Sequence, residues 1–173
     1  PVARYVNWLS NVVRGDFGYR FMDGTRVTEV IGRRLSASLL LMSSALAIGI
    51  VVGVPLGVFI GQRQYSFWDF SLTGFSFLGI STPSFITGIA ALLVFAINLR
   101  MFPAGGMRPV DRESTIWTTL HYLALPSMVL SLNFVATFMR YTRFSMLEVI
   151  RLDYVNTARA KGLTPNAVTW RHI

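Results

Sequence analysis

The feature that most constrains this chain is the uncharged run LSASLLLMSSALAIGIVVGVPLGVFIG at residues 35–61. A helix of that length, rising ~1.5 Å per residue, is longer than the hydrocarbon layer of a bilayer, which is about 30 Å thick. Composition agrees, because 53% of the 173 residues are hydrophobic, only 14% are charged and the mean hydropathy is +0.51. Soluble domains are usually less apolar and more charged. The sequence therefore predicts a membrane protein with a tilted span at about 35–61.

Two further segments are candidate spans. Residues 70–99 are uncharged but interrupted by GISTPS around Pro83, and residues 116–139 are less apolar because they contain His121, Pro126 and Asn133. With the first run they predict an all-α, polytopic bundle whose transmembrane region extends over 35–141. Charge does not settle its orientation, since basic residues flank the spans on both sides. The tail after residue 139 is the denser short basic segment, so we expect it to be cytoplasmic.

Small and polar residues mark particular positions in these spans. Gly49, Gly53 and Gly57 recur every four residues and form a flat strip that another helix could approach closely, although glycine is common in spanning helices generally. Pro55 is expected to kink the first span. The second span is interrupted where non-helical backbone is tolerated only if it is buried in protein or lines a wet cavity. The candidates for a translocation pathway are Ser81, Thr82, Pro83, Ser84 and Asn133, with a plain proline kink and an interhelical hydrogen bond of Asn133 as the alternatives.

The first 34 residues are predicted to be an extracytoplasmic amphipathic segment rather than a span. One helical face carries apolar residues with an aromatic beside them, as in a helix lying at a lipid surface: Tyr5, Leu9, Val12, Val13 and Trp8. A turn is expected at Asp23-Gly24, after which amphipathic sequence continues into the first span. The chain begins at Pro1 and its last residues read as helix, so we expect a fragment of a longer protein.

Several function classes are disfavoured. The formal net charge is +8, but no dense Arg/Lys run indicates nucleic acid, and the bias suits a bilayer. Cysteine is absent and the two histidines lack acidic neighbours at ligand spacing, so neither a metal site nor an embedded enzyme is expected. A secondary transporter would be expected to carry intramembrane carboxylates, and none of the acidic residues lies clearly within a predicted span. A non-transporting membrane scaffold is compatible with the composition.

A polar stretch, DYVNTARAKGLTPN at 153–166, follows the three apolar segments. Asp153 is suited to cap a helix at 154–161, and Gly162 is suited to the left-handed residue that ends it. Thr164 and Pro165 then read as the cap and first residue of a second helix. The two helices predict a compact elbow outside the membrane, whose small side chains would admit another protein's surface: Thr157, Ala158 and Ala160. An ordinary loop with well-formed caps is the alternative.

This segment resembles the cytoplasmic coupling motif, the EAA loop, of inner-membrane permease subunits of binding-protein-dependent ABC importers. The chain is similar to the dipeptide, oligopeptide and nickel permease branch in several blocks in the same order: RGDFGYRF, VTEVIGRRLSASLLL, GVPLGVFIG, GISTPSFITGIAALLVFA, FPAGG and TRFSMLEVIRLDYVNTARAKG. The blocks cover nearly the whole chain. The glutamate that gives the motif its name is replaced, since Asn156, Thr157 and Ala158 occupy that place.

The resemblance implies one subunit of a larger transporter in the inner membrane of a prokaryotic cell. It implies six spans, of which this chain would hold the second to fourth, and four kinds of partner: a homologous permease subunit, two cytoplasmic ATPase subunits, an extracytoplasmic solute-binding protein and the lipid bilayer. ATP and Mg would be bound by the ATPase subunits, and this chain would bind no cofactor. Peptides are the expected cargo, with nickel, glutathione or another small solute as alternatives.

The resemblance also assigns the elbow its role. Residues 142–173 would form cytoplasmic coupling helices, with 154–161 seated in a groove of the ATPase. Arg159 and Lys161 would pair with acidic groups there, Leu163 would be an apolar anchor and Gly162 would fix the exit angle. The full set of coupling residues is Asp153, Tyr154, Thr157, Ala158, Arg159, Ala160, Lys161, Gly162 and Leu163.

Overall fold

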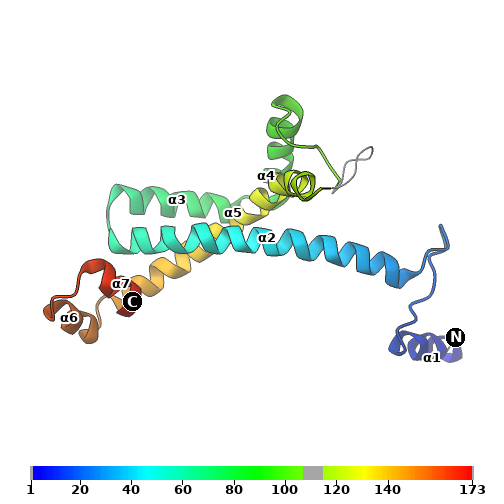
Figure 1. Ribbon diagram of the computed structural model, residues 1–173, viewed down its shortest axis with the longest axis horizontal. Helices are drawn as coiled ribbons and strands as arrows, with labels where there is room; N and C mark the ends of the chain where they lie inside the picture. Colours follow the sequence, from blue (N-terminus) through cyan, green and yellow to red (C-terminus); the bar gives the residue numbers. More distant parts are fainter. Residues whose placement is uncertain (1, 107–114, 173) are drawn as a thin grey trace. The chain divides into compact units, whose positions relative to one another are not determined.

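The computed structural model describes residues 2–106 and 115–172, which form helices joined by turns and loops (Figure 1). The prediction of an all-α fold is confirmed. The chain divides into two compact units, Pro1–Leu41 and Met42–Ile173. In chain order the helices are α1 (Val2–Val13), α2 (Val27–Gln62), α3 (Phe67–Ser81), α4 (Ser84–Ala91), the π-helix η1 (Leu92–Asn98), α5 (Ile116–Val149), α6 (Asp153–Ala160) and α7 (Pro165–His172).

In the first unit, α1 is the amphipathic helix that the sequence predicts. None of its residues is buried, and the rings of Tyr5 and Trp8 lie 5.9 Å apart between centroids. The predicted turn is also present, since Gly24 has a φ of 66° and the Asp23 carboxylate accepts a hydrogen bond from the Thr25 amide at 3.2 Å. That hydrogen bond holds the pKa of Asp23 below its usual value. The position of α1 at a lipid surface stays a prediction.

The first predicted span lies within a longer helix, α2, which is apolar and long enough to cross a membrane. It begins at Val27 rather than at residue 35, because the amphipathic sequence before the apolar run contains no proline and continues the helix through Gly32. Glu29 and Arg33 form an exposed i,i+4 ion pair at 3.4 Å in this part of the helix. The helix then continues through Pro55 to Gln62.

In the second unit, the glycines of α2 form the close helix contact that their spacing predicts. Gly49, Gly53, Gly57 and Gly61 are all buried against α5. A Cβ atom at Gly53 would lie 2.8 Å from the carbonyl oxygen of Val135, and one at Gly57 would lie 2.7 Å from that of Met139. Only residues without a side chain allow the two backbones to approach this closely.

The second predicted span is a pair of helices bent by 98° at residues 82–83, and not a straight helix. Thr82 is extended, with φ −86° and ψ 120°, because a residue before proline is driven out of the helical region. Its hydroxyl and amide both donate to the carbonyl of Leu78, which closes α3, and Pro83 then leads into α4. The predicted interruption is therefore confirmed, and the described part of the chain contains two continuous helices that are candidate spans plus this bent pair.

The third predicted span corresponds to the first part of α5. The helix starts at Ile116 with a capping box between Thr115 and Thr118, runs through Pro126 and ends at Val149 instead of 139. The sequence after 139 loses its apolar character but contains neither glycine nor proline, so the helix continues beyond the apolar segment. This extension joins the span to α6 through a short turn.

Candidate functional site

The end of α6 has the geometry that the sequence predicts. Gly162 has a φ of 81°, its amide donates to the carbonyl of Arg159 at 2.9 Å, and the Leu163 amide donates to that of Ala158 at 3.4 Å. These two hydrogen bonds are those of a Schellman motif, in which glycine at the left-handed position satisfies the last carbonyls of a helix. Lys161 is the C-cap, so the helix ends one residue earlier than expected.

The starts of the two elbow helices differ from one another. Thr164 caps α7 as predicted, since its hydroxyl accepts the Ala167 amide at 3.3 Å. The expectation for Asp153 was wrong, because Leu152 occupies the N-cap of α6 and no side chain caps that end. Asp153 is the first helical residue, where its negative charge is favourable at the positive end of the helix dipole.

The elbow, defined as α6, α7 and the turn between them, has a small apolar core. Val155, Ala158 and Val168 are buried together, and Val149 from the last turn of α5 packs against them. Ala158 is only 6% exposed, so the expectation that its side chain lies on the approach surface is wrong. Its small size is needed because α7 covers it, and α5 is joined to the elbow through packing as well as through the chain.

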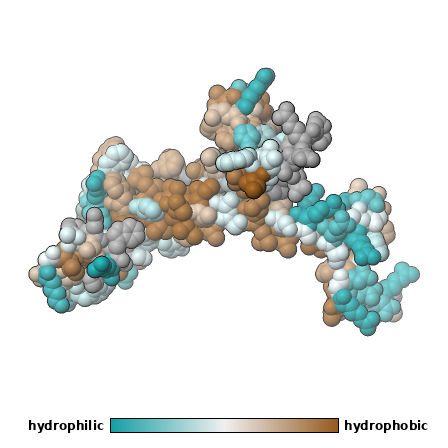
Figure 2. All heavy atoms as spheres, in the orientation of Figure 1, coloured by the Kyte–Doolittle hydropathy of each residue, from teal (hydrophilic) through white to brown (hydrophobic). Residues whose placement is uncertain are grey.

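The opposite side of the elbow is exposed and polar. In Figure 2 the elbow carries hydrophilic and hydrophobic residues side by side, whereas the helices beside it are largely hydrophobic. The Thr157 hydroxyl donates a hydrogen bond to the carbonyl of Asp153 at 2.9 Å, so its polar group is satisfied within the helix. The following predicted coupling residues are exposed in the structure: Asp153, Tyr154, Thr157, Arg159, Ala160, Lys161, Gly162 and Leu163.

A hydrogen bond also connects the elbow to α2. The Gln62 side-chain amide, at the last residue of α2, donates to the Thr169 hydroxyl of α7 at 2.7 Å. The elbow is thus attached to two helices, α5 through Val149 and α2 through Gln62. A displacement of the elbow would act on both of them.

The predicted pathway residues lie at the bend between α3 and α4. Ser81, Pro83 and Ser84 are exposed and Thr82 is half-buried. On either side of the bend, Gly79 faces Ala136 and Gly88 faces Val129, so the stretch of α5 that passes the bend includes Asn133. Among the described residues the Asn133 amide makes no hydrogen bond, so the interhelical role is not observed for it, and the pathway role stays a prediction.

An apolar groove of about 340 Å³ lies beyond the bend, between α4, η1 and α5. Its walls include Thr87, Val94, Phe95, Met128 and Leu132. Sequence reasoning did not find it, because the π-helical geometry of η1, which re-aims these side chains, has no signal in the residues.

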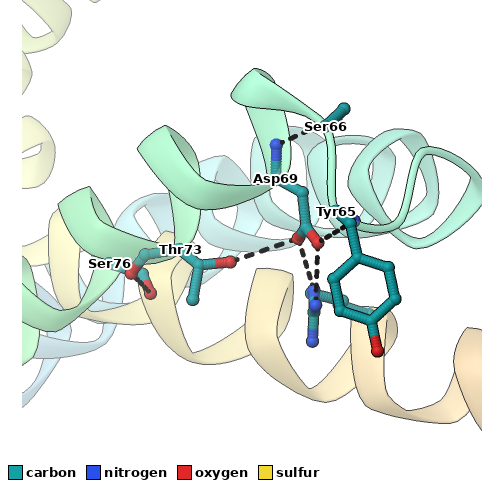
Figure 3. A network of polar contacts seen from close by, with 6 residues as sticks. Tyr65, Ser66, Asp69, Thr73 and Ser76 are labelled. Carbon is teal, nitrogen blue, oxygen red and sulfur yellow. Dashed lines mark hydrogen bonds and ion pairs between the residues drawn. The ribbon is translucent and has the colours of Figure 1, made fainter.

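A polar cluster at the start of α3 was also missed by sequence reasoning. Asp69, in the first turn of α3, is 2% exposed and forms a bidentate ion pair with Arg143 of α5 (Figure 3). Asp69 reads as the end of a polar turn, and nothing in the sequence indicates a partner on another helix. The sequence did contain one local signal for the start of α3, because Ser66 stands three residues before the acidic Asp69. In the structure Ser66 caps α3 by accepting the Asp69 amide at 3.2 Å.

A second interhelical contact is made by serines of α2 and α5. The hydroxyls of Ser44 and Ser127 lie 2.7 Å apart, and Ser127 is 2% exposed. Such pairs satisfy polar groups between helices in an apolar environment. Among the described residues, the polar attachments between helices are therefore made by serine hydroxyls, by the Gln62–Thr169 hydrogen bond and by an ion pair, whereas the Asn133 side chain makes none.

Comparison with known proteins agrees with these features. Residues 53–173 match the model of the family described as the inner membrane component of binding-protein-dependent transport systems. The chain is 40% identical over 171 residues to the oligopeptide transport system permease protein AppB of Bacillus subtilis, covering 98% of this chain and 54% of AppB.

Two more relatives are oligopeptide transport system permease proteins named OppB. The protein of Salmonella typhimurium is 33% identical over 175 residues, covering 99% of this chain and 54% of the relative. That of Mycobacterium bovis is 37% identical over 180 residues, covering 99% and 55%. The chain spans about half the length of these curated relatives. With its apolar helices, its glycine-mediated packing and its polar elbow, the chain belongs to the family of inner membrane components of binding-protein-dependent transport systems.

Proposed function

We propose that this chain is part of the permease of an ATP-driven importer for dipeptides or oligopeptides. The observation that carries the proposal is the similarity of almost the whole chain to oligopeptide permeases, together with an exposed elbow fixed to the ends of two membrane helices. In this proposal the complete subunit has six spans. It works with a homologous permease, two cytoplasmic ATPase subunits and an extracytoplasmic solute-binding protein.

The elbow transmits force in this mechanism and performs no chemistry. The exposed side of α6 sits in a groove of the ATPase, where Arg159 and Lys161 pair with acidic groups and Leu163 provides an apolar contact. When the ATPase subunits close on ATP, they displace the elbow, and the packing of Val149 passes the displacement to α5. The bundle then moves between inward-open and outward-open states, as alternating access requires. ATP hydrolysis takes place on the partner subunits.

The bend between α3 and α4 is the proposed wall of the translocation pathway. Its hydroxyls and the amide of Asn133 supply polarity without formal charge, which suits a permease that passes cargo selected by a separate binding protein. The exposure of Ser81, Pro83 and Ser84 supports this role. Cargo other than peptides, such as nickel, glutathione or another small solute, is the main alternative within the family.

Reconstitution of the complete transporter tests the proposal. We expect labelled peptides to accumulate in proteoliposomes only when ATP, both permeases, the ATPase subunits and the binding protein are present. Accumulation of nickel or glutathione in place of peptides would assign the other cargo class. Uptake that follows an ion gradient and ignores ATP would contradict the importer mechanism and favour a secondary transporter.

A further inference from the structure

The ion pair between Asp69 and Arg143 has the geometry of a rigid joint. Arg143 donates from Nε to Oδ1 at 2.6 Å and from Nη2 to Oδ2 at 2.8 Å. Two parallel bonds fix the orientation of both groups as well as their distance. Because 3% of the Asp69 side chain and 27% of the Arg143 side chain are exposed, solvent and salt screen this pair less than a surface pair.

Asp69 is also held firmly by its own segment of chain. Oδ2 accepts the Tyr65 amide at 3.1 Å and Oδ1 accepts the Thr73 hydroxyl at 3.4 Å (Figure 3). Tyr65 has a φ of 61°, the left-handed conformation that favours glycine, and its amide then points at the carboxylate. The carboxylate therefore moves with the first turn of α3, and cannot reorient alone without breaking these contacts.

Arg143 is equally well connected to the elbow. It lies in the last two turns of α5, whose unbroken helix ends at Val149 in the elbow core. Around it, Thr142 and Met146 pack on Gly57 and Gly61 of α2. Arg143 thus stands between two residues of α5 that pack on glycines of α2, and the elbow is attached to the same end of α5.

Helix α3 begins beside this end of α5, at the Asp69–Arg143 pair, and extends to the bend at residues 82–83. A second arginine of α5, Arg140, lies over the ring of Phe77 in α3, 4.9 Å from its centroid. Farther along the α3–α5 contact small residues meet, since a Cβ added at Gly79 would lie 3.7 Å from the Cβ of Ala136. Contacts between small apolar groups have no preferred direction, so the two arginine contacts, and above all the bidentate ion pair, fix the position of α3 along α5.

We propose that Asp69 and Arg143 are positioning residues that make α3 follow α5 when the elbow is displaced. Through them, motion that starts at the elbow reaches the bend at residues 82–83. The inference rests on the proposed function of the elbow. It adds a specific joint, because without the pair the elbow would move α5 and α2 while α3 and the bend lag behind.

A distance measurement tests the joint directly. In a complete complex whose own cysteines have been replaced, spin labels can be introduced at Leu78 on α3 and Arg151 beside the elbow, both exposed. In the complete complex we expect one narrow distance distribution that is the same with and without ATP. Asp69→Asn should broaden the distribution and make it depend on nucleotide. An Asp69→Asn distribution as narrow and constant as that of the wild type would overturn the inference.

A second readout is the number of peptides imported per ATP hydrolysed by the assembled complex. We expect Asp69→Asn and Arg143→Met each to lower this ratio by about tenfold or more, a change of ~1.4 kcal/mol or more. The double variant should be no worse than either single one, because both remove the same contact. Additive losses, or an unchanged ratio, would contradict a joint, and a merely structural role would reduce the yield of complex without changing the ratio.

Controls separate this inference from the proposed function. Glu29→Gln removes an exposed ion pair of α2 and should leave both readouts unchanged. If Asp69→Asn fails to assemble, Arg143→Lys keeps the charge but loses the bidentate contact, and it should still broaden the distances. If the wild type imports no peptide but its label distances behave as expected, the cargo assignment fails and the joint stands. If it imports peptide and the variants match it, the joint fails alone.

Discussion

The two ends of the second unit are built differently (Figure 1). At the elbow end, α2, α3 and α5 are fixed by glycine packing, by the Asp69–Arg143 pair and by the hydrogen bond from Gln62. Beyond the bend, no residue of α4 is buried, and an open apolar groove is lined by α4, η1 and α5. This difference indicates which part of the second unit can transmit a displacement and which part can change conformation. The elbow end is suited to move as one body, and the bend end is suited to change shape.

The largest expected effect comes from disturbing the glycine packing of the elbow end. Gly57→Ala would place a Cβ atom 2.7 Å from the backbone oxygen of Met139, which cannot move aside as a side chain would. We expect a loss of about 1–3 kcal/mol in stability, the usual cost of overpacking. Thermal unfolding of the purified complex measures it.

Gly74→Ala is the matched control, because nothing lies within 4 Å of the added methyl group on α3. Alanine is the better helix former by roughly 0.5–1 kcal/mol, so this variant should be neutral or more stable than the wild type. Equal losses for the two variants would show that the elbow end is no more tightly packed than an open helix face.

A change at the elbow itself should separate force transmission from assembly. Gly162→Pro cannot adopt the φ of 81° and removes the amide that bonds to Arg159. We expect peptide uptake to fall by about tenfold, equivalent to ~1.4 kcal/mol, while insertion and ATP hydrolysis persist. Gly162→Asn should retain most of the uptake, because asparagine tolerates the left-handed region. Normal uptake by the proline variant would remove the elbow from the mechanism.

A matched pair of alanines on α6 sharpens the distinction between the inner and outer sides of the elbow. Ala158→Leu should loosen the elbow at a cost of about 1–3 kcal/mol, because Val155 and Val168 enclose that position. Ala160→Leu lies on the exposed side, so it should leave the elbow stable while weakening contact with the ATPase. Hydrogen exchange of α6 and α7 amides tells the two effects apart, and identical exchange in both variants would contradict the assigned sides.

The smallest effect is expected at the bend. Pro83→Ala restores an amide donor and relaxes the restriction on Thr82, so α3 and α4 should straighten in part. Since the bend end is the adaptable one, we expect uptake to change by only about threefold, or ~0.7 kcal/mol. Uptake assays and distances between labels on α3 and η1 measure this. Complete loss of uptake would show that the bend is a rigid element.

Much of this arrangement could be predicted from the sequence, because it depends on signals that are local. Apolar runs locate the membrane helices, a four-residue glycine spacing predicts the α2–α5 contact, and Gly162 predicts the end of α6. The misses involve contacts between distant positions. Burial of Ala158 depends on α7 folding back over α6, and Asp69 acquires its partner from a helix 74 positions away. The predicted span at 116–139 does not give the end of α5, which lies at Val149, because loss of apolar character marks the edge of a bilayer and not the end of a helix.

Site-specific crosslinking in the complete transporter tests the central claim most directly. A photoreactive side chain at Lys161 should capture the ATPase subunit, with a yield that changes when ATP binds. The same group at Phe75, an exposed apolar position on α3, should capture lipid or permease and never the ATPase. If Lys161 never captures the ATPase while the complex still imports peptide, the elbow is not the point at which force enters this chain.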